Sequence, residues 1–461
     1  MLAVHESSGL VCAPHDPELC FASCARVLPR TPGHPSMSRP RPPRPPALRY
    51  RPARRTDVET LAELGARVYR VSSLEQRREF YTDHPRFGLR DVRIGELDGR
   101  VVASLVLYSH TAFVRGQSLG VTGVGSVAVS PEHRRRGVGE TLMRMALREM
   151  RQQGRALSML YAFRDSFYHK LGYGAAERVQ TLAISPSNLP ASEEARRTRR
   201  LMLPDRPAVQ ALYERVAQQG HFALARTEEW WNRRLWTYPG DWIVYEGRRR
   251  GQIEGYLYYE ADAANGPFKL SLDVNEFVAA TPEAHRGLIG YLHSLADQVQ
   301  EIHHATSADD GWLSLLKTSQ NLRPGAEVGL YNDSGNIANG AMLRITDPRL
   351  ALETFPVAPQ ARGEVTLDVD DPVLPINTRV YRVSARDGKL KVGAETPRTG
   401  VRRRLPRLTV SAEALATLMA GAMSPMRAAD IGMIGSTLGA AEVVEHWFRA
   451  RPAFLYQANA F

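Results

Sequence analysis

Hydrophobic positions recur with the period of an α-helix directly after the first 55 residues. One helical face is formed by Val58, Leu61, Leu64 and Val68. Thr56 or Asp57 precedes this face as a helix cap, so we expect a helix that ends near Arg70. A further helix is predicted for residues 74–81.

The pattern then changes to the alternation that is typical of β-strands. Residues 93–97 and 101–108 flank Asp98-Gly99, a dipeptide that favours a two-residue hairpin turn. Residues 121–129 and 157–162 also predict strands, and residues 143–150 predict a helix between them. This order of elements is typical of a mixed α/β domain, which we expect to end near residue 190.

The last part of the chain, residues 346–461, has a different pattern. Short alternating stretches predict strands at residues 365–369, 379–383, 390–392 and 408–410. The segment Arg386-Asp387-Gly388-Lys389 predicts a turn between two of them. Helices are expected at residues 411–420, with Ser411 as cap, and at residues 440–448. The expected result is a sheet with helices on one face.

Positive charge and cysteine are concentrated in the N-terminal part of the chain. The 461 residues carry a formal net charge of +11 and include 3 cysteines. Residues 1–55 hold nine arginines, three acidic residues, eleven of the 30 prolines and every cysteine. The remainder has 51 basic and 46 acidic residues, which excludes a disulfide framework, a cysteine nucleophile and a cysteine-ligated metal there. We expect no metal site, and the length predicts roughly three domains.

Residues 1–46 form a tail rich in proline and arginine. We expect it to be disordered, because proline lacks an amide donor and arginines repel one another. Met37 is an alternative start, and the tail is either dispensable or an arm that binds polyanions. No secretory signal is found, and the smoothest apolar stretch, residues 414–444, is interrupted by Pro425, Arg427 and Asp430. We therefore expect a cytoplasmic protein without a transmembrane helix.

A chemical motif follows the strand that ends at Val129. Ser130-Pro131-Glu132-His133 leads into Arg134-Arg135-Arg136-Gly137-Val138-Gly139, and a helix then begins. Glycines let backbone amides approach a ligand, and a helix start adds unpaired N–H groups and the positive end of the helix dipole. These features predict a pyrophosphate site whose arginines reach the outer phosphates. The alternative is a glycine turn before a surface helix, with the arginines in solvent.

A second motif, Phe167-Tyr168-His169-Lys170-Leu171-Gly172-Tyr173-Gly174, follows a strand farther along the chain. The order strand, RxxGxG, helix, strand and YxxxGY resembles the GNAT superfamily of N-acetyltransferases. The resemblance implies that acetyl-coenzyme A is the co-substrate. It also implies that the strand edge at Val127, Ala128 and Val129 binds the pantetheine arm. The residues implied to cradle the pyrophosphate are Arg134, Arg135, Arg136, Gly137, Val138 and Gly139.

Residues 277–288 repeat part of the first motif. Val278, Ala279, Pro282-Glu283 and Arg286-Gly287 match it, Thr281 stands in place of Ser130, and one arginine remains. Either an acetyltransferase unit was duplicated and its second phosphate loop degenerated, or the similarity over a dozen residues is chance. We expect residues 200–345 to be structural or to shape the substrate site.

The chain as a whole resembles the enhanced-intracellular-survival (Eis) family. The features that carry this resemblance are an active unit, a degenerate unit, a third domain similar to the sterol-carrier-protein fold and an apolar chain end. The expected fold is α/β with mixed sheets, in domains at residues 47–196, 197–345 and 346–461. In this family the terminal carboxylate is the general base and a tyrosine is the general acid. The resemblance therefore implies catalytic roles for Phe461 and Tyr168, and a homohexamer.

The expected reaction transfers acetyl directly to a primary amine of a small molecule, an aminoglycoside-like compound or a lysine side chain. A base must take the proton of the attacking amine, and the leaving thiolate benefits from an acid. Tyrosine, with a pKa of ~10, is protonated at neutral pH, whereas an α-carboxylate, pKa ~3.5, needs apolar surroundings to be a better base. We expect Phe461 and Phe454 to supply them. The alternatives are a packed aromatic at Tyr168 and a docked hydrophobic terminus at Phe461.

The acceptor and the class of function leave alternatives open. Family members that acetylate aminoglycosides often have an acidic penultimate residue, whereas this chain has Ala460. An aromatic cluster either lines an acceptor pocket or forms the core of the second domain: His221, Phe222, Trp230, Trp231, Trp236 and Tyr238. The competing functions are a lipid-binding or scaffold protein that uses the third domain, and a nucleic-acid binder that uses the tail. We expect neither a nucleic acid nor a membrane as partner.

Overall fold

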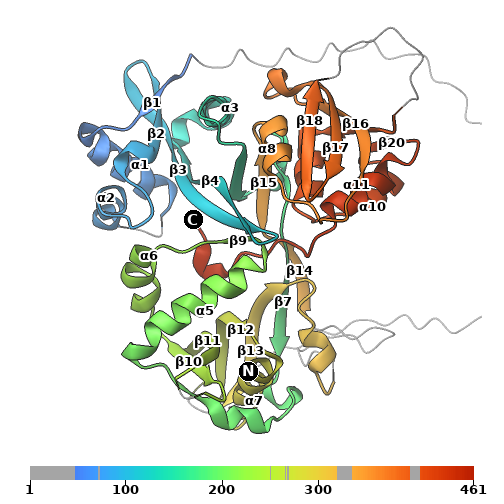
Figure 1. Cartoon of the computed structure of the whole chain (residues 1–461). Helices are drawn as coiled ribbons and strands as arrows, with labels where there is room; N and C mark the ends of the chain where they lie inside the picture. The colour runs from blue at the N-terminus through green and yellow to red at the C-terminus, as the bar shows by residue number, and fades with distance from the viewer. Residues whose placement is uncertain are drawn as a thin grey trace, which may run out of the picture. The chain divides into compact units, whose positions relative to one another are not determined.

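The computed structural model describes residues 47–70, 73–249, 251–264, 266, 269–318, 335–394 and 405–461. These residues form three β-sheets with helices packed on them (Figure 1). The α/β fold class with mixed sheets is thereby confirmed, whereas the expected tail, residues 1–46, lies outside the described residues. Across the described ranges, no helix has the length and apolar character needed to cross a membrane.

The first sheet carries the two motifs singled out in the sequence. In order across the sheet, its strands are β1 (Arg49–Pro52), β2 (Val92–Leu97), β3 (Arg100–Val114), β4 (Gln117–Val129), β5 (Leu157–Tyr161), β15 (Ala341–Ile345) and β6 (Gly174–Ala175), and β9 (His221–Leu224) pairs with the end of β3. Its helices are α1 (Val58–Val68), α2 (Leu74–Thr82), α3 (Val138–Gln152) and α4 (Asp165–His169).

Two tight turns join β2, β3 and β4. Asp98 (φ 49°) and Gly99 (φ 76°) form the expected hairpin turn. A second turn, at Arg115 (φ 50°) and Gly116 (φ 77°), lies within residues for which the sequence predicted no strand. Both β3 and β4 are longer than expected, because polar residues such as Ser109 interrupt the hydrophobic pattern, although the backbone pairing continues past them.

The second sheet contains the repeated motif. In order, its strands are β14 (Gly335–Asn339), β7 (Arg178–Ile184), β13 (Val299–Ser307), β12 (Leu270–Ala279), β11 (Ile253–Asp262), β10 (Asp241–Glu246) and β8 (Thr198–Arg200). Its helices are α5 (Arg206–Gln218), α6 (Glu228–Arg233) and α7 (Pro282–His293).

The first two sheets exchange strands. β7 precedes residue 196 in the chain, yet it pairs with β13 and β14 of the second sheet. Conversely, β15 pairs with β5 and β6 of the first sheet, and β9 pairs with β3. The order of strands along the chain and their membership in a sheet therefore differ, and neither sheet is complete without residues from the other half.

The third sheet contains the four expected strands and adds a strand, Gly435–Thr437, and a helix, Pro425–Asp430, that the sequence did not predict. Its strands, in order, are β18 (Lys389–Ala394), β17 (Arg379–Arg386), β16 (Gly363–Asp370), β19 (Arg407–Ser411) and β20 (Gly435–Thr437). Its helices are α9 (Ala412–Met419), α10 (Pro425–Asp430) and α11 (Ala440–Phe448), and α8 (Pro348–Thr354) packs against β18. Ser411 caps α9 by accepting a hydrogen bond from the Ala414 amide, and Asp387-Gly388 forms the turn, so both of these predictions are confirmed.

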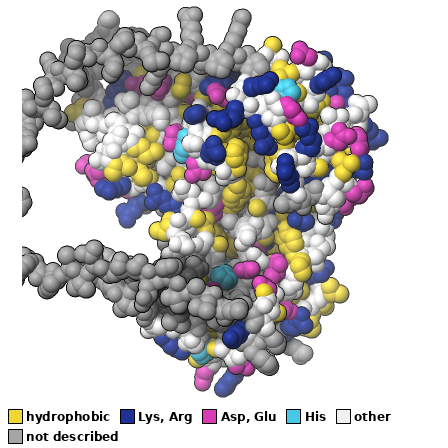
Figure 2. Space-filling view, turned by 180° about the vertical axis from the view of Figure 1, so that it is seen from behind, with side chains coloured by type: hydrophobic (Ala, Val, Ile, Leu, Met, Phe, Trp, Pro, Cys, Tyr) yellow, Lys and Arg dark blue, Asp and Glu magenta, His cyan; other side chains and the backbone are white. Residues whose placement is uncertain are grey.

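Charged side chains of both signs are interspersed over the face opposite to that of Figure 1. Figure 2 shows Lys and Arg side chains beside a band of hydrophobic side chains in the upper half of this face, with Asp and Glu among them. This mixture agrees with the near balance of basic and acidic residues after residue 55.

A buried ion pair joins the first sheet to the start of the third domain. Arg344 of β15 and Asp371, directly after β16, are both 0% exposed, and Arg344 Nη2 donates to both carboxylate oxygens at 2.7 Å. Asp371 also accepts hydrogen bonds from the amide of Leu374 and from Asn377 Nδ2. Both oxygens of this carboxylate therefore have partners, whereas Arg344 Nε is buried without a hydrogen-bond partner among the described residues.

We predict that Asp371→Asn lowers the free energy of unfolding by about 3–5 kcal/mol, because it leaves the guanidinium of Arg344 buried without a counter-charge. Urea denaturation measures this change. The matched control is Asp368→Asn, which breaks the half-exposed pair with Arg407 and should cost at most about 1 kcal/mol. Equal effects of the two substitutions would contradict the role given to the buried pair.

Candidate active site

The expected cofactor strand, β4, contains a β-bulge. Ser126 has a φ of 48°, and the register between β3 and β4 shifts beside it. β4 pairs with β5 only at Thr122 and Gly123, so its edge beyond this point has no β5 partner. A bulge bends a strand and changes the direction of its edge groups, as is common beside active sites.

Side chains occupy part of the edge formed by Val127, Ala128 and Val129. The hydroxyl of Tyr69 donates to Val127 O at 2.8 Å, and Arg134 Nε donates to Val129 O at 3.2 Å. The side chain of Ala128 is buried. A ligand that uses these carbonyls as acceptors must therefore replace two side-chain donors.

The loop between β4 and α3 has the backbone form that its glycine requires. Gly137 is the N-cap residue of α3 with a φ of 79°, and Arg135 also has a positive φ, 60°. Thr141 returns to this loop, because both its amide and its hydroxyl donate to Gly137 O at 2.9 Å. The first-turn amides of the 15-residue helix α3 have no partner inside the helix.

The residues around this loop fit a diphosphate. Arg134, Arg135 and Arg136 are exposed, whereas Val138 is buried and anchors the helix start. A Cβ on Gly139 would lie 3.3 Å from Val129 Cγ2, so a larger residue would crowd the strand. Free amides, a helix N-terminus and three solvent-accessible guanidinium groups thus stand together at one end of β4.

Tyr168 lies on α4 and is almost completely buried. Its ring meets those of Phe167 at 5.0 Å and Tyr173 at 5.9 Å, edge to face. Its hydroxyl has no hydrogen-bond partner among the described residues. Burial raises the pKa of Tyr168, so the hydroxyl keeps its proton at neutral pH.

The end of the chain lies against β4 of the first sheet (Figure 1). A Cβ on Gly123 would come within 2.7 Å of the Phe461 ring, and one on Gly125 would come within 3.1 Å of the Phe461 carboxyl carbon. The same ring contacts His110 at 4.6 Å and Tyr161 at 5.6 Å. Glycine within a strand therefore marks the place where the chain terminus approaches the backbone.

One expectation about the terminus is wrong. Phe454 was expected to surround the terminal carboxylate together with Phe461. Its ring instead meets Tyr456 at 5.1 Å, and it lines a cavity of the second domain. The ring neighbours of Phe461 come from β3 and β5, and they include Tyr108 at 5.7 Å. Only the folded chain brings these strands and the last residue together.

Arg86 holds the last residues through their backbone. Its Nη1 donates to Asn459 O at 2.9 Å and to Ala460 O at 3.0 Å, and its guanidinium stacks 3.2 Å from the centre of a Trp230 ring. Carbonyls accept these hydrogen bonds whatever the side chain, which is why the sequence did not single out Arg86.

A buried network holds Asn459 from the other side. Arg226 and Glu276 form an ion pair with side-chain exposures of 1% and 0%. Arg226 Nε donates to Asn459 Oδ1 at 2.7 Å, and Asn459 Nδ2 donates to the hydroxyl oxygen of Tyr213 at 2.8 Å. Asn459, for which the sequence suggested no role, therefore connects the chain end to the second domain.

Two histidines near the terminus are neutral. Burial lowers the pKa of His84 to about 4 and that of His110 to about 3. The Nε2 atom of His110 is buried without a hydrogen-bond partner among the described residues. An imidazole with such a low pKa binds a proton weakly, so neither residue is a strong base at neutral pH.

The aromatic cluster of the second domain forms a core. Trp230 and Trp231 are buried in one core with Trp236 and Tyr238 packed against it, and Trp231 stacks on Trp236 at 4.9 Å. His221 and Phe222 instead lie on β9, which pairs with the first sheet, and Phe222 is buried in another core. Of the two alternatives drawn from the sequence, the packed core fits these contacts.

Three regions of the chain match known domain families. Residues 49–176 and residues 223–345 each match a family described as acetyltransferase (GNAT) domain. Residues 348–456 match the sterol carrier protein domain.

Several relatives with similar sequences are acetyltransferases. A protein of Streptomyces griseus, described as an uncharacterized N-acetyltransferase, is 27% identical over 380 residues, which cover 76% of this chain and 85% of the relative. N-acetyltransferase Eis of Mycobacterium tuberculosis is 28% identical over 247 residues, which cover 50% of this chain and 60% of the relative.

Solved structures share the fold. A GCN5-related N-acetyltransferase from Anabaena variabilis has a TM-score of 0.75 at 20% identity, and Eis1 from Mycobacterium abscessus has a TM-score of 0.70 at 20% identity. Each comparison covers 90% of this chain and 100% of the solved one. The order of two acetyltransferase domains and a sterol-carrier domain is thus found by sequence and is consistent with the shared fold.

Glu177 connects the terminal segment to the first sheet. It is 1% exposed, and its carboxylate oxygens accept hydrogen bonds from the amides of Leu455 at 2.6 Å and Ala341 at 2.9 Å. Burial raises the pKa of Glu177 from 4.5 to about 7. Because the folded-state pKa is the higher one, its contribution to stability is full below pH 4.5 and is lost as the pH rises through about 7.

We predict that wild type loses stability relative to Glu177→Gln as the pH rises from 5 to 8. At pH 5 the wild type should have the higher Tm. The carboxyl group of Glu177 has an oxygen for each of the amides of Leu455 and Ala341, whereas glutamine has one oxygen for both. At pH 8 the buried charge should cost the wild type about 3 kcal/mol and remove that advantage. Scanning calorimetry of both proteins measures the difference.

The matched control is the exposed residue Glu193, replaced by glutamine. Its Tm difference from wild type should be the same at both pH values. A Tm difference between wild type and Glu177→Gln that stays constant from pH 5 to 8 would show that Glu177 does not titrate in this range.

Proposed function

This chain is an N-acetyltransferase of the GNAT superfamily, with an Eis-like arrangement of two acetyltransferase domains and a sterol-carrier domain, and from this premise we propose that it acetylates primary amines at the first sheet. The Eis resemblance drawn from the sequence motifs is thereby confirmed, as is the enzyme class. We propose the acceptor class, acetyl-coenzyme A as the co-substrate and the roles of individual residues.

The observation that carries the proposal is the position of the chain end. The carboxyl group of Phe461 lies over Gly125, on the same strand that leads into the loop of Arg134 to Gly139. A carboxylate and a site that fits a diphosphate therefore belong to one strand, β4. We assign the proton acceptor to the terminal carboxylate because of its position over Gly125.

The residues of β4 and its loop have separate tasks in this proposal. Acetyl-coenzyme A supplies the acetyl thioester when it is bound. The edge of Val127, Ala128 and Val129 binds its pantetheine amides in place of the Tyr69 and Arg134 side chains. The loop binds the pyrophosphate through backbone amides and the guanidinium groups of Arg134, Arg135 and Arg136.

The transfer itself needs two proton movements. The nitrogen of the amine forms a bond to the thioester carbonyl carbon, the bond from that carbon to sulfur breaks, and the thiolate leaves. The Phe461 carboxylate takes the proton from the amine, and the hydroxyl of Tyr168 gives one to the thiolate. Burial raises the pKa of Tyr168, so the hydroxyl is protonated at neutral pH and has a proton to give. Orientation of both substrates replaces a covalent enzyme intermediate.

We keep the homohexamer and a small amine or lysine side chain as acceptor. The penultimate Ala460 supplies no carboxylate for a polycationic sugar. The third domain as a lipid carrier gains no specific support, because Leu415 and Met419 of α9 and Trp447 of α11 are buried in its core.

We predict that adding Gly-Ser after Phe461 abolishes turnover, because it moves the terminal carboxylate away from its position over Gly125. Release of free thiol from acetyl-coenzyme A, screened against an amine library, measures turnover. The extended chain should still gain Tm on addition of acetyl-coenzyme A, which shows that the cofactor site is intact. Undiminished turnover in the extended chain would exclude the terminal carboxylate as the base.

We predict that Tyr168→Phe lowers kcat about 100-fold or more, because it removes the proton donor and leaves the packed ring in place. The Kd for acetyl-coenzyme A, measured by calorimetry, should change by less than about twofold. The matched control is Tyr173→Phe, which removes another buried hydroxyl of the same cluster, one that hydrogen-bonds Ser158. If both variants lose kcat equally, Tyr168 acts through packing and not as the acid.

A further inference from the structure

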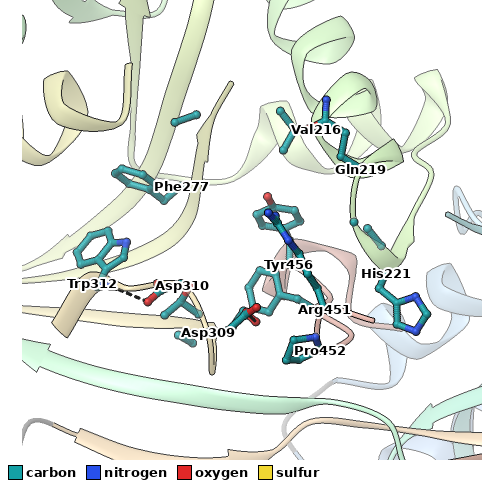
Figure 3. A pocket seen from close by; sticks show the side chains of 18 of the residues that line it. Val216, Gln219, His221, Phe277, Asp309, Asp310, Trp312, Arg451, Pro452 and Tyr456 are labelled. Carbon is teal, nitrogen blue, oxygen red and sulfur yellow. Dashed lines mark hydrogen bonds between the residues drawn. The ribbon is translucent and has the colours of Figure 1, made fainter. Parts of the chain in front are cut away.

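The second acetyltransferase domain has two cavities of its own, of about 510 and 450 Å³. β12 and β13 are paired only up to Val274 and His304, and beyond this pair the two strands separate. The larger cavity opens between the separated strands, and Phe277 and Thr306 line it. Figure 3 labels Phe277 on its wall. Both cavities share Asn275, His304 and Ala305, so they meet where the strands separate. We call this pair of cavities the notch.

The described residues of the notch offer no site for a phosphate. In the first domain the helix after the central strand begins at a glycine loop with three exposed arginines. In the second domain Thr281 caps α7 by accepting from the Ala284 amide at 3.1 Å, and Pro282 occupies the first helical position. Arg286, the arginine retained from the motif, pairs with Glu283 of the same helix. A coenzyme with a pyrophosphate therefore finds neither free amides nor a cluster of cations here.

Carboxylates surround the notch. Asp309 and Asp310 line the larger cavity, and Figure 3 shows them between Trp312 and Arg451 in that view. Glu260 and Asp273 line the smaller cavity. Asp273 and Asp309 form no ion pair among the described residues. Arg451 is the one arginine or lysine in either described lining, and His285 stays neutral because burial lowers its pKa.

His304 gives the centre of the notch an acceptor. It is 6% exposed, and its Nδ1 lies 2.9 Å from Val274 O. Because a carbonyl only accepts, Nδ1 carries the proton, and Nε2 has a lone pair. Nε2 has no partner among the described residues, and burial lowers the pKa of His304 to about 4, so the ring stays neutral.

The walls of the notch are partly apolar. The rings of Trp312 and His304 are 4.6 Å apart, and Phe277 meets Trp312 edge to face at 5.1 Å. Asp310 Oδ1 accepts the Trp312 amide at 2.9 Å, the bond that is dashed in Figure 3. A matching ligand donates hydrogen bonds, carries positive charge in more than one place and has an apolar body between the charges.

We propose that the notch binds an aliphatic polyamine, with one ammonium group at Asp309 in the larger cavity, another at Asp273 in the smaller cavity and a nitrogen that donates to His304 Nε2. Methylene groups between the nitrogens suit the walls at Phe277 and Trp312. This site differs from the acetyl-transfer site at β4, and it does not depend on the roles proposed there for Tyr168 and Phe461.

The test is calorimetric titration of the full chain with spermidine, first in wild type and then in the double variant Asp273→Asn with Asp309→Asn. Both residues are exposed, so neither change should affect folding. We expect one site per chain and a Kd that rises about tenfold in the variant, because two charge-assisted hydrogen bonds become neutral ones. Putrescine, which is shorter and has two nitrogens, should bind more weakly than spermidine.

The matched control removes two exposed carboxylates of the same domain outside the notch, in Asp262→Asn with Asp297→Asn. Its Kd for spermidine should equal that of wild type. Absence of binding to wild type would overturn the proposal. Equal weakening by both double variants would show that spermidine binds by general charge. Equal binding by all three proteins would place spermidine elsewhere, including at the amine site of the first domain. Either result would overturn the proposal.

Discussion

The buried ion pair of Arg226 and Glu276 fixes the end of the chain, and the proposed chemistry depends on that end. Both side chains are almost fully removed from solvent, so each charge requires the other and every remaining polar atom needs a partner. Asn459 supplies one such partner to Arg226 Nε. The second domain therefore holds the last residues, although the carboxyl group of Phe461 lies over a strand of the first sheet.

Other contacts make this position rigid without using side chains of the terminal segment. Arg86 donates to the carbonyls of residues 459 and 460, and Glu177 accepts from the amide of Leu455. Backbone anchoring restricts where the chain passes but leaves side-chain identity free. The exchange of β7, β9 and β15 between the first two sheets has a related effect, because neither domain can form its complete sheet alone.

The two acetyltransferase domains differ in charge where their central strands separate. In the first domain the strands β4 and β5 separate beside a glycine loop with three arginines, whereas β12 and β13 separate beside a capped helix and several carboxylates. The capping threonine and the proline after it satisfy the helix start from within the chain, which removes the amides that a phosphate would use. The capped start of α7 thus leaves the notch open but gives a phosphate no free amides there.

Local elements and motifs were determined by the sequence itself. The Asp98-Gly99 turn, the cap at Ser411 and the helix expected after Gly139 follow from preferences of a few neighbouring residues. The structure has each of them, with the helix beginning at Val138. The family resemblance also rested on short motifs, which are recognised by the order and spacing of their residues in the sequence. Such features need no knowledge of distant residues.

The tertiary structure alone decided which distant residues meet. The pairing of β15 with β5 joins residues far apart in the chain, and no local pattern distinguishes it from pairing in the second sheet. The same holds for Phe454, which lies in the second domain and not beside Phe461, and for Arg86 and Glu177, which bind backbone atoms of the terminal segment. Gly123 and Gly125 lie within the strand expected at residues 121–129, yet the group that approaches them came only from the fold. Local propensity acts over a few residues, whereas burial and long-range hydrogen bonds depend on the whole chain.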